Sequence, residues 1–411
     1  MSATDDAAAA CEAAEREPAN AITSPLTLLF AVAVGVIVTN LFASQTLIGL
    51  IGPSLGFDAA GGLIATATLL GYAAGLFLLV PLADLLENRR LIVRMLACAA
   101  LVAGAAALAP TASSLLIALF VLGAACSAIQ ILVPIAASMA PPERRGRVIG
   151  DVMSGLMIGI LLSRPLASLI ADEFGWRAFY GLSAVAMTML VLVLAMRLPQ
   201  RRPVAQSGYR ALIASLWRLL RAEPVLRRRA LTASLAMAAF SLFWTSIALR
   251  LSQPPFQLSQ RGVALFALVG AAGAAATPFF GRAGDRGWTR PATIASHLVM
   301  IAALMLAAWA GSPKAAGTPL LSLMLMGVSA VLLDIGVVGD QTLGRRAINL
   351  LQPEARGRLN GLFVGLFFLG GAVGSTAAGV AGASGGWTSI CVIGIAFALA
   401  AVTVDWIGKS A

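Results

Sequence analysis

Long apolar stretches separated by short polar or charged segments run through almost the whole chain. A membrane-spanning helix needs about 20 apolar residues, and twelve stretches can serve as such helices. The pattern therefore predicts an all-α polytopic membrane protein. The expected spans are 26–51, 59–82, 91–110, 113–138, 147–171, 178–197, 230–251, 261–281, 291–310, 318–343, 358–382 and 387–407.

The second half of this pattern repeats the first half. Residues 142–147 (Pro-Glu-Arg-Arg-Gly-Arg) return without a gap as residues 353–358 (Pro-Glu-Ala-Arg-Gly-Arg). In the same register, the Gly-Trp pair at 175–176 returns at 386–387. Two apolar halves related in this way are typical of transporters built from parallel repeats, with a substrate site between them. We therefore expect two pseudo-symmetric six-helix bundles.

The polar segments divide the chain into five parts. We expect a disordered cytoplasmic tail at 1–25, an N-terminal bundle at 26–197, a cytoplasmic linker at 198–229, a C-terminal bundle at 230–407 and a short cytoplasmic tail at 408–411. The first tail has no basic segment before an apolar run, so we do not expect a secretory signal. The linker contains an amphipathic pattern, which predicts a helix on the inner leaflet or one packed on the floor of the bundles.

Composition and charge support the membrane interpretation. Hydrophobic residues make up 59% of the chain and charged residues 11%, whereas soluble domains carry about 25% charged residues. The net charge of +11 could suggest nucleic acid, but the basic residues lie between apolar spans, so we expect a lipid bilayer and no nucleic acid as partner. If both termini are cytoplasmic, the opposite side holds only Arg177, Arg250, Arg261 and Lys314. This bias predicts that both termini lie on the cytoplasmic side, and the membrane we expect is the bacterial inner (plasma) membrane.

Catalytic and metal-binding patterns are absent from the sequence. The four cysteines have no metal-ligand spacing, and there is one histidine. Structural and catalytic zinc sites need several such ligands, so we expect no metal and no cofactor. The sequence also has no Gly-x-Ser-x-Gly or His-Glu-x-x-His motif, and we do not expect an enzyme.

Two loops resemble the signature loop of the major facilitator superfamily, Gly-x-Leu-Ala-Asp-Arg-x-Gly-Arg-Arg. Residues 81–90 (Pro-Leu-Ala-Asp-Leu-Leu-Glu-Asn-Arg-Arg) follow the second span and keep its Leu-Ala-Asp. Residues 281–287 (Gly-Arg-Ala-Gly-Asp-Arg-Gly) occupy the corresponding place in the second half and keep its Gly and Asp.

Other segments resemble particular branches of that family. Residues 159–168 are similar to Gly-x-x-x-Gly-Pro-x-x-Gly-Gly of the drug/proton antiporters, with Arg164 in place of the proline. The arginine of that branch's fourth-span motif is replaced by Leu119. Residues 40–45 and 141–147 resemble the bacterial sugar-efflux or arabinose-efflux-permease-like group.

The resemblance implies a major-facilitator fold that works by alternating access. It implies a monomeric secondary transporter whose partners are protons and a small organic molecule such as a drug, sugar or metabolite, with efflux by antiport as the expected activity. Two alternatives stay open: a proton symporter or uniporter for uptake, and a non-transporting membrane sensor or scaffold on the same fold.

Asp334 and Arg164 are the charged residues placed deep within expected spans. A carboxylate in a span costs about 2.5–3.5 kcal/mol on insertion scales, and burial disfavours its charged form, so Asp334 is the candidate for proton coupling. Arg164 lies roughly 18 Å along its helix from the cytoplasmic side and needs a partner or water. It could pair with Asp334, bind an anionic substrate, or hold the two halves together.

Polar side chains in the spans are candidates for substrate binding, because a cavity needs a few hydrogen-bonding groups among apolar walls. Hydrogen bonding between packed helices is the alternative for each of them. The candidates are Asn40, Ser44 and Gln45 in the first span, Ser241, Trp244 and Thr245 in the seventh, and Gln130 and Gln341 elsewhere.

A further group of charged residues is expected to act in gating. The resemblance implies that Asp84 and Asp285 each face the beginning of a helix in the opposite half, near Arg358 and Arg147, where the helix dipole favours an anion. The neighbouring Arg89, Arg90, Arg356 and Arg358 could add ion pairs. We also expect Asp340 to pair locally with Arg345 and Arg346, and His297 to be peripheral.

Overall fold

The computed structural model describes residues 22–56, 61–141, 143–203, 208–312, 317–352 and 355–408. Within these ranges every regular element is a helix, and the predicted all-α architecture is confirmed. Most of the expected N-terminal tail and most of the expected C-terminal tail lie outside the described residues.

The described residues of the first half form nine helical segments. The expected first and fourth spans are each built from two helices, and Pro53 and Pro134 lie inside the second helix of each pair. The segments are α2 (Ser24–Phe42), α3 (Ser44–Ser54), α4 (Gly62–Leu78), η2 (Val80–Asp84), α5 (Asn88–Ala107), α6 (Ala112–Cys126), α7 (Ile129–Ser138), α8 (Arg145–Phe174) and α9 (Trp176–Arg197).

The linker helix and the second half follow. The segments are α10 (Tyr209–Ala222), α11 (Pro224–Ser252), α12 (Gln260–Val269), η3 (Gly270–Ala276), α13 (Thr277–Asp285), α14 (Thr289–Ala310), α15 (Pro319–Asn349) and α16 (Arg356–Ile407). The helix α11 begins before residue 230, where the second bundle was expected to start. Pro224 occupies its first turn, where a proline is preorganised for a helix and its missing N–H costs nothing.

Ten helices of the described residues are long and apolar enough to cross a membrane, when α4 is counted together with η2 and α6 together with α7. Two features explain the difference from the expected twelve. The long α16 contains two helices joined at Gly386, whose φ of 61° is a conformation that favours glycine. The expected eighth span is divided among α12, η3 and α13. The count of twelve membrane crossings stays a prediction, and the described helices are compatible with it.

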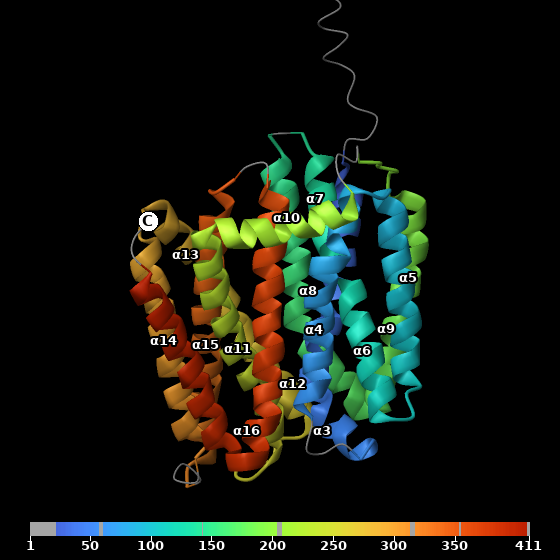
Figure 1. Cartoon of the computed structure of the whole chain (residues 1–411). Coiled ribbons are helices and arrows are strands. Elements are labelled where there is room, and N and C mark those ends of the chain that lie inside the picture. Colours follow the sequence, from blue (N-terminus) through green and yellow to red (C-terminus); the bar gives the residue numbers. More distant parts are fainter. Residues whose placement is uncertain are drawn as a thin grey trace, which may run out of the picture.

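The helices form two bundles that lie side by side (Figure 1). In the first bundle α2 packs on α8, α4 on α6 and α5 on α9, and in the second α11 packs on α16 and α14 on α15. The bundles meet where α4 contacts α16, α8 contacts α12 and α3 contacts α11. The helix α10 runs across one end of both bundles, and the C-terminal end of the described chain lies at that end (Figure 1).

Small residues bring α4 and α16 very close together. A Cβ on Gly62 would lie 2.3 Å from the carbonyl oxygen of Ser375, and a Cβ on Gly365 would lie 2.5 Å from the ring of Phe77. Glycine removes the side chain that would keep such backbones apart. The two bundles are therefore in tight contact toward both ends of this helix pair.

Candidate functional site

Arg164 lies at the centre of the boundary between the bundles. It is 5% exposed, and its Nε donates a hydrogen bond of 2.9 Å to Oε1 of Gln45 on α3. The guanidinium carbon lies 4.3 Å from the ring centroid of Trp244, 5.2 Å from that of Phe42 and 5.3 Å from that of Phe240. Aromatic faces attract cations, most strongly where water is excluded. Three rings from both bundles thus stabilise this buried charge.

Trp244 connects Arg164 to Asp334. Its indole Nε1 donates a hydrogen bond of 2.9 Å to Oδ1 of Asp334 on α15, while its ring faces Arg164. Arg164 and Asp334 form no direct ion pair, although they are close enough to interact electrostatically. Asp334 is half-buried as a residue, whereas Arg164 is buried.

Two glycines of η3 allow this arrangement. A Cβ on Gly270 would lie 2.4 Å from the ring of Trp244, and a Cβ on Gly273 would lie 2.4 Å from Cβ of Asp334. Real Cβ atoms do not approach so closely, so any larger residue must displace the indole or the carboxylate. The glycines let η3 pack directly against both.

Several polar atoms near Arg164 have no hydrogen-bond partner. They include Nη2 of Arg164, Nε2 of Gln45 and Oγ of Ser44, all of which are buried. Unpaired buried polar groups are costly, and they are commonly satisfied by water or by a ligand. The two nitrogen atoms are donors and therefore require an acceptor.

Other predicted binding residues take part in contacts between helices. Ser183 of α9 donates a hydrogen bond of 2.6 Å to Oδ1 of Asn40, and Nε2 of Gln130 donates one of 3.2 Å to the hydroxyl of Tyr72. For Asn40 and Gln130, these contacts correspond to the alternative that the sequence left open.

The remaining polar candidates lie on two helices of the second bundle. Thr245 and Ser375 share a hydrogen bond of 3.1 Å between α11 and α16. Ser241 faces the same helix, because its Oγ lies 3.0 Å from the position of a Cβ on Gly371. Gln341 is half-buried on α15.

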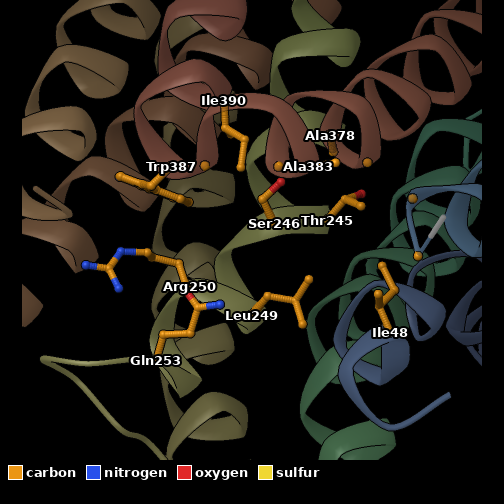
Figure 2. A pocket seen from close by; sticks show the side chains of 15 residues that line it. Ile48, Thr245, Ser246, Leu249, Arg250, Gln253, Ala378, Ala383, Trp387 and Ile390 are labelled. Atoms are coloured by element: carbon orange, nitrogen blue, oxygen red, sulfur yellow. The ribbon is translucent and has the colours of Figure 1, made fainter. Parts of the chain in front are cut away.

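A cavity of about 430 Å³ lies between the bundles, at the end opposite α10. Thr245, Ser246, Arg250 and Gln253 line one wall, and Ile48 lies across from them (Figure 2). Trp244, which precedes Thr245 in the chain, belongs to the Arg164 cluster. The cavity therefore adjoins that cluster along α11, although neither Arg164 nor Asp334 lines it.

The residues expected to act in gating are arranged differently in the two halves. Asp84 is exposed at the end of η2, and Arg358 of α16 is near enough to act on its charge. Nη1 of Arg358 also donates a hydrogen bond of 3.0 Å to Oγ of Ser215 on α10. Asp285, in contrast, forms an ion pair with Arg346 of its own bundle, so its partner in this structure is not the start of α8 near Arg147.

The other basic residues of this group make local contacts. Nε of Arg90 lies 3.0 Å from Oε2 of Glu87, and Nε of Arg356 donates a hydrogen bond of 3.1 Å to the carbonyl of Asn349. Arg89 is half-buried near the start of α5.

The expected pairing of Asp340 with Arg345 and Arg346 is wrong. Asp340 is 1% exposed, and its Oδ1 lies 3.0 Å from Nε2 of His297 on α14. Residues five or six positions apart on a helix point to different faces, whereas His297 lies on the helix packed against α15. The histidine expected to be peripheral is fully buried.

The sequence did not single out four residues that complete the Arg164 cluster. Phe42 and Phe240 are apolar residues in apolar helices, and Gly270 and Gly273 are two of 41 glycines. The spacing of Phe240 four positions before Trp244, which places both rings on one helix face, is the signal that could have found one of them.

Comparisons with known proteins agree with this architecture. Residues 27–343 match the family model of the Major Facilitator Superfamily. The chain is 37% identical over 398 residues to the uncharacterised transporter YgaY of Escherichia coli O157:H7, which covers 95% of this chain and 98% of that protein.

Solved structures share the fold at low sequence identity. The nucleoside transporter NupG matches with a TM-score of 0.69 and 16% identity, over 93% of this chain and all of that one. A D-xylose-proton symporter matches with a TM-score of 0.69 and 13% identity, over 92% of this chain and 96% of that one. The predicted major-facilitator fold is confirmed. The chain belongs to the Major Facilitator Superfamily and is a membrane transporter of that family.

Proposed function

We propose that this transporter exports a small organic molecule in exchange for protons, by alternating access. In this proposal Asp334 carries the proton, and Arg164 and Gln45 hold the substrate. The observation that carries the proposal is the position of Trp244, which stacks on Arg164 of the first bundle and donates a hydrogen bond to Asp334 of the second. A change of charge at Asp334 is thereby linked to both bundles.

The unpaired atoms suggest the chemistry of the substrate. Nη2 of Arg164 and Nε2 of Gln45 offer donors, and the carboxylate of Asp334 offers an acceptor. The rings of Phe42, Phe240 and Trp244 supply apolar walls. A molecule with an acceptor group at one end and a hydroxyl or ammonium donor at the other fits this set, as sugars, many metabolites and many drugs do.

The same chemistry favours antiport of substrate and proton over symport. A substrate donor can bond to the ionised carboxylate, but a protonated Asp334 carries its own hydrogen and competes with that donor. Substrate and proton then exclude one another, which is the requirement for antiport.

The second candidate is uptake with protons. An anionic substrate without a donor group would bind at Arg164 and favour the protonated, uncharged form of Asp334, because like charges repel. Substrate and proton would then bind together, which is the requirement for symport.

We further propose that the end covered by α10 faces the cytoplasm of a bacterium and that the protein works as a monomer in the inner membrane. Support comes from the sequence, since the loops at that end carry most of the 29 Lys and Arg residues. In this orientation the 430 Å³ cavity lies toward the periplasmic side. Asp84, Asp285 and the nearby arginines would then control the cytoplasmic entrance.

Proton movement in everted membrane vesicles tests the proposal. Vesicles acidified by respiration and loaded with a pH dye would be exposed to sugars, amino acids, nucleosides, lipophilic cations and organic acids. We expect one class to alkalinise the interior, and we expect Asp334→Asn to abolish that response. Asp151→Asn, which changes an exposed carboxylate of α8, serves as the matched control. Acidification by a substrate, or an unchanged response in Asp334→Asn, would overturn the antiport proposal.

A further inference from the structure

A second group of buried charges lies inside the C-terminal bundle, apart from the Arg164 cluster. It joins one side chain from each of four helices: Arg229 of α11, His297 of α14, Asp340 of α15 and Asp405 of α16. Each of the four side chains is at most 5% exposed. Nη1 of Arg229 lies 3.3 Å from Oδ1 of Asp405 and donates a hydrogen bond of 3.2 Å to Oγ1 of Thr293.

The imidazole of His297 lies between two carboxylates. Its Nε2 is 3.0 Å from Oδ1 of Asp340, and its Nδ1 is 3.9 Å from Oδ2 of Asp405. A neutral imidazole has one N–H donor and one acceptor nitrogen. If His297 were neutral and both aspartates were ionised, one ring nitrogen would direct its lone pair at a carboxylate oxygen. An imidazolium carries an N–H on both ring nitrogens. It can donate to Asp340 and attract Asp405 across 3.9 Å, a distance at which Nδ1 forms no hydrogen bond in this structure.

We propose that His297 holds a bound proton as an imidazolium, which makes the group of Arg229, His297, Asp340 and Asp405 a second proton-binding site of the protein. With this proton the two cations balance the two aspartates. One member of the site, Asp340, lies on α15 six residues after Asp334. The site does not depend on the function proposed for Asp334, because its geometry involves none of the central residues.

The surrounding charges limit the alternatives. Arg228 of α11 and Arg290 of α14 lie at the edge of the group and act on Asp405 or on one another. Arg345 and Arg346 follow on α15, and Arg346 pairs with Asp285 of α13. A metal ion is disfavoured beside so many arginines, and no group of three metal-ligating side chains was found among the residues that the structure describes. A proton is the cation that fits.

The bound proton has a structural consequence. The imidazolium attracts a carboxylate on α15 and another on α16, and Arg229 ties the second of these to α11. Removal of the proton would leave one nitrogen lone pair facing a carboxylate among buried side chains. Packing of these four helices would therefore depend on occupancy of the site.

The protonation state of His297 can be observed directly, because the sequence contains only one histidine. Protein with a histidine-free tag would be labelled with ¹⁵N-histidine, reconstituted in lipid nanodiscs and examined by NMR at pH 7.5. A free histidine is about nine-tenths neutral at that pH. We expect both ring nitrogens of His297 to show the signature of an imidazolium. A neutral tautomer in the wild-type protein would overturn the proposal.

Two variants test which groups hold the proton. In Asp340→Asn, the ring loses its closest carboxylate, and we expect a neutral imidazole at pH 7.5; an imidazolium that persists in this variant would contradict the proposed site. In Asp285→Asn, a carboxylate outside the group is changed, and we expect the wild-type signature. If Asp340→Asn does not fold, the wild-type spectrum decides the question. Neither spectrum depends on transport, so the result is separate from that of the vesicle assay.

Discussion

Arg164 lies over the face of the Trp244 indole, and Asp334 accepts a hydrogen bond from the N–H at the edge of the same ring. Trp244 presents its face to the arginine, at 4.3 Å from the guanidinium carbon, and its N–H to the carboxylate, at 2.9 Å. A direct ion pair would hold the two bundles in one arrangement. The indole ring between Arg164 and Asp334 keeps the two charges coupled without a direct ion pair.

The two functions of Trp244 can be separated by mutation. Trp244→Phe keeps an aromatic face over Arg164 but removes the N–H that bonds to Asp334. A hydrogen bond to a charged group contributes about 1.5–3 kcal/mol, so we expect the rate of proton-coupled transport to fall at least about tenfold. Trp288→Phe, at an exposed position, is the control, and initial rates per amount of folded protein provide the measurement. Equal rates in the two variants would show that the N–H is dispensable.

Arg164→Lys keeps the positive charge but loses the planar group that stacks on three rings and bonds to Gln45. We expect substrate affinity to weaken by about tenfold or more, with normal insertion into the membrane. Equilibrium binding to purified protein measures this change. The control is Arg177→Lys, since Arg177 belongs to α9 and lies outside the cluster. Wild-type affinity in Arg164→Lys would mean that charge alone is sufficient.

The glycines of η3 provide a test of packing. Gly273→Ala would place a Cβ 2.4 Å from Cβ of Asp334, and overpacking of this kind costs about 1–3 kcal/mol. We expect a lower thermal unfolding temperature in detergent and a loss of transport. Gly281→Ala is the matched control, because a Cβ there meets nothing within 4 Å. Similar unfolding temperatures for both variants would argue against the close packing of η3 on α15.

Asn40 should affect stability rather than substrate recognition. Asn40→Ala removes the acceptor for Ser183 and leaves a hydroxyl of a buried pair without its partner, at a cost of about 1–3 kcal/mol. We expect a lower unfolding temperature and an unchanged substrate affinity. In the double variant with Ser183→Ala the cost should be less than the sum of the two single costs, because the residues share one interaction. A loss of substrate affinity without a loss of stability in Asn40→Ala would indicate that Asn40 contacts the substrate.

Sequence reasoning recovered the fold because apolar length and the internal repeat are properties of the chain itself. It also singled out Arg164, Gln45, Trp244 and Asp334, which lie together in the structure, since a polar or charged group in an apolar helix contrasts with its neighbours. Asn40 gave the same contrast, yet it faces another helix of its own bundle. A polar residue in one sequence carries no information on which face of its helix meets the cavity.

Other features were hidden for physical reasons. Phe42 and Phe240 act on Arg164 through their ring faces, and an aromatic residue in an apolar helix shows no contrast. The His297–Asp340 contact joins two different helices. It can be recognised only once the packing of α14 on α15 is known. The eighth span is divided at η3, which packs closely against Asp334 of another helix, and the sequence alone does not show that contact.

The central claim is that substrate and proton exclude one another at Asp334. Once the vesicle assay has identified a substrate, its binding to purified protein in weakly buffered solution can be followed with a pH indicator. Our account predicts that the wild-type protein releases a proton on binding, up to one per substrate, and that Asp334→Asn binds the substrate without releasing protons. Proton uptake by the wild type, or undiminished release by Asp334→Asn, would contradict the account.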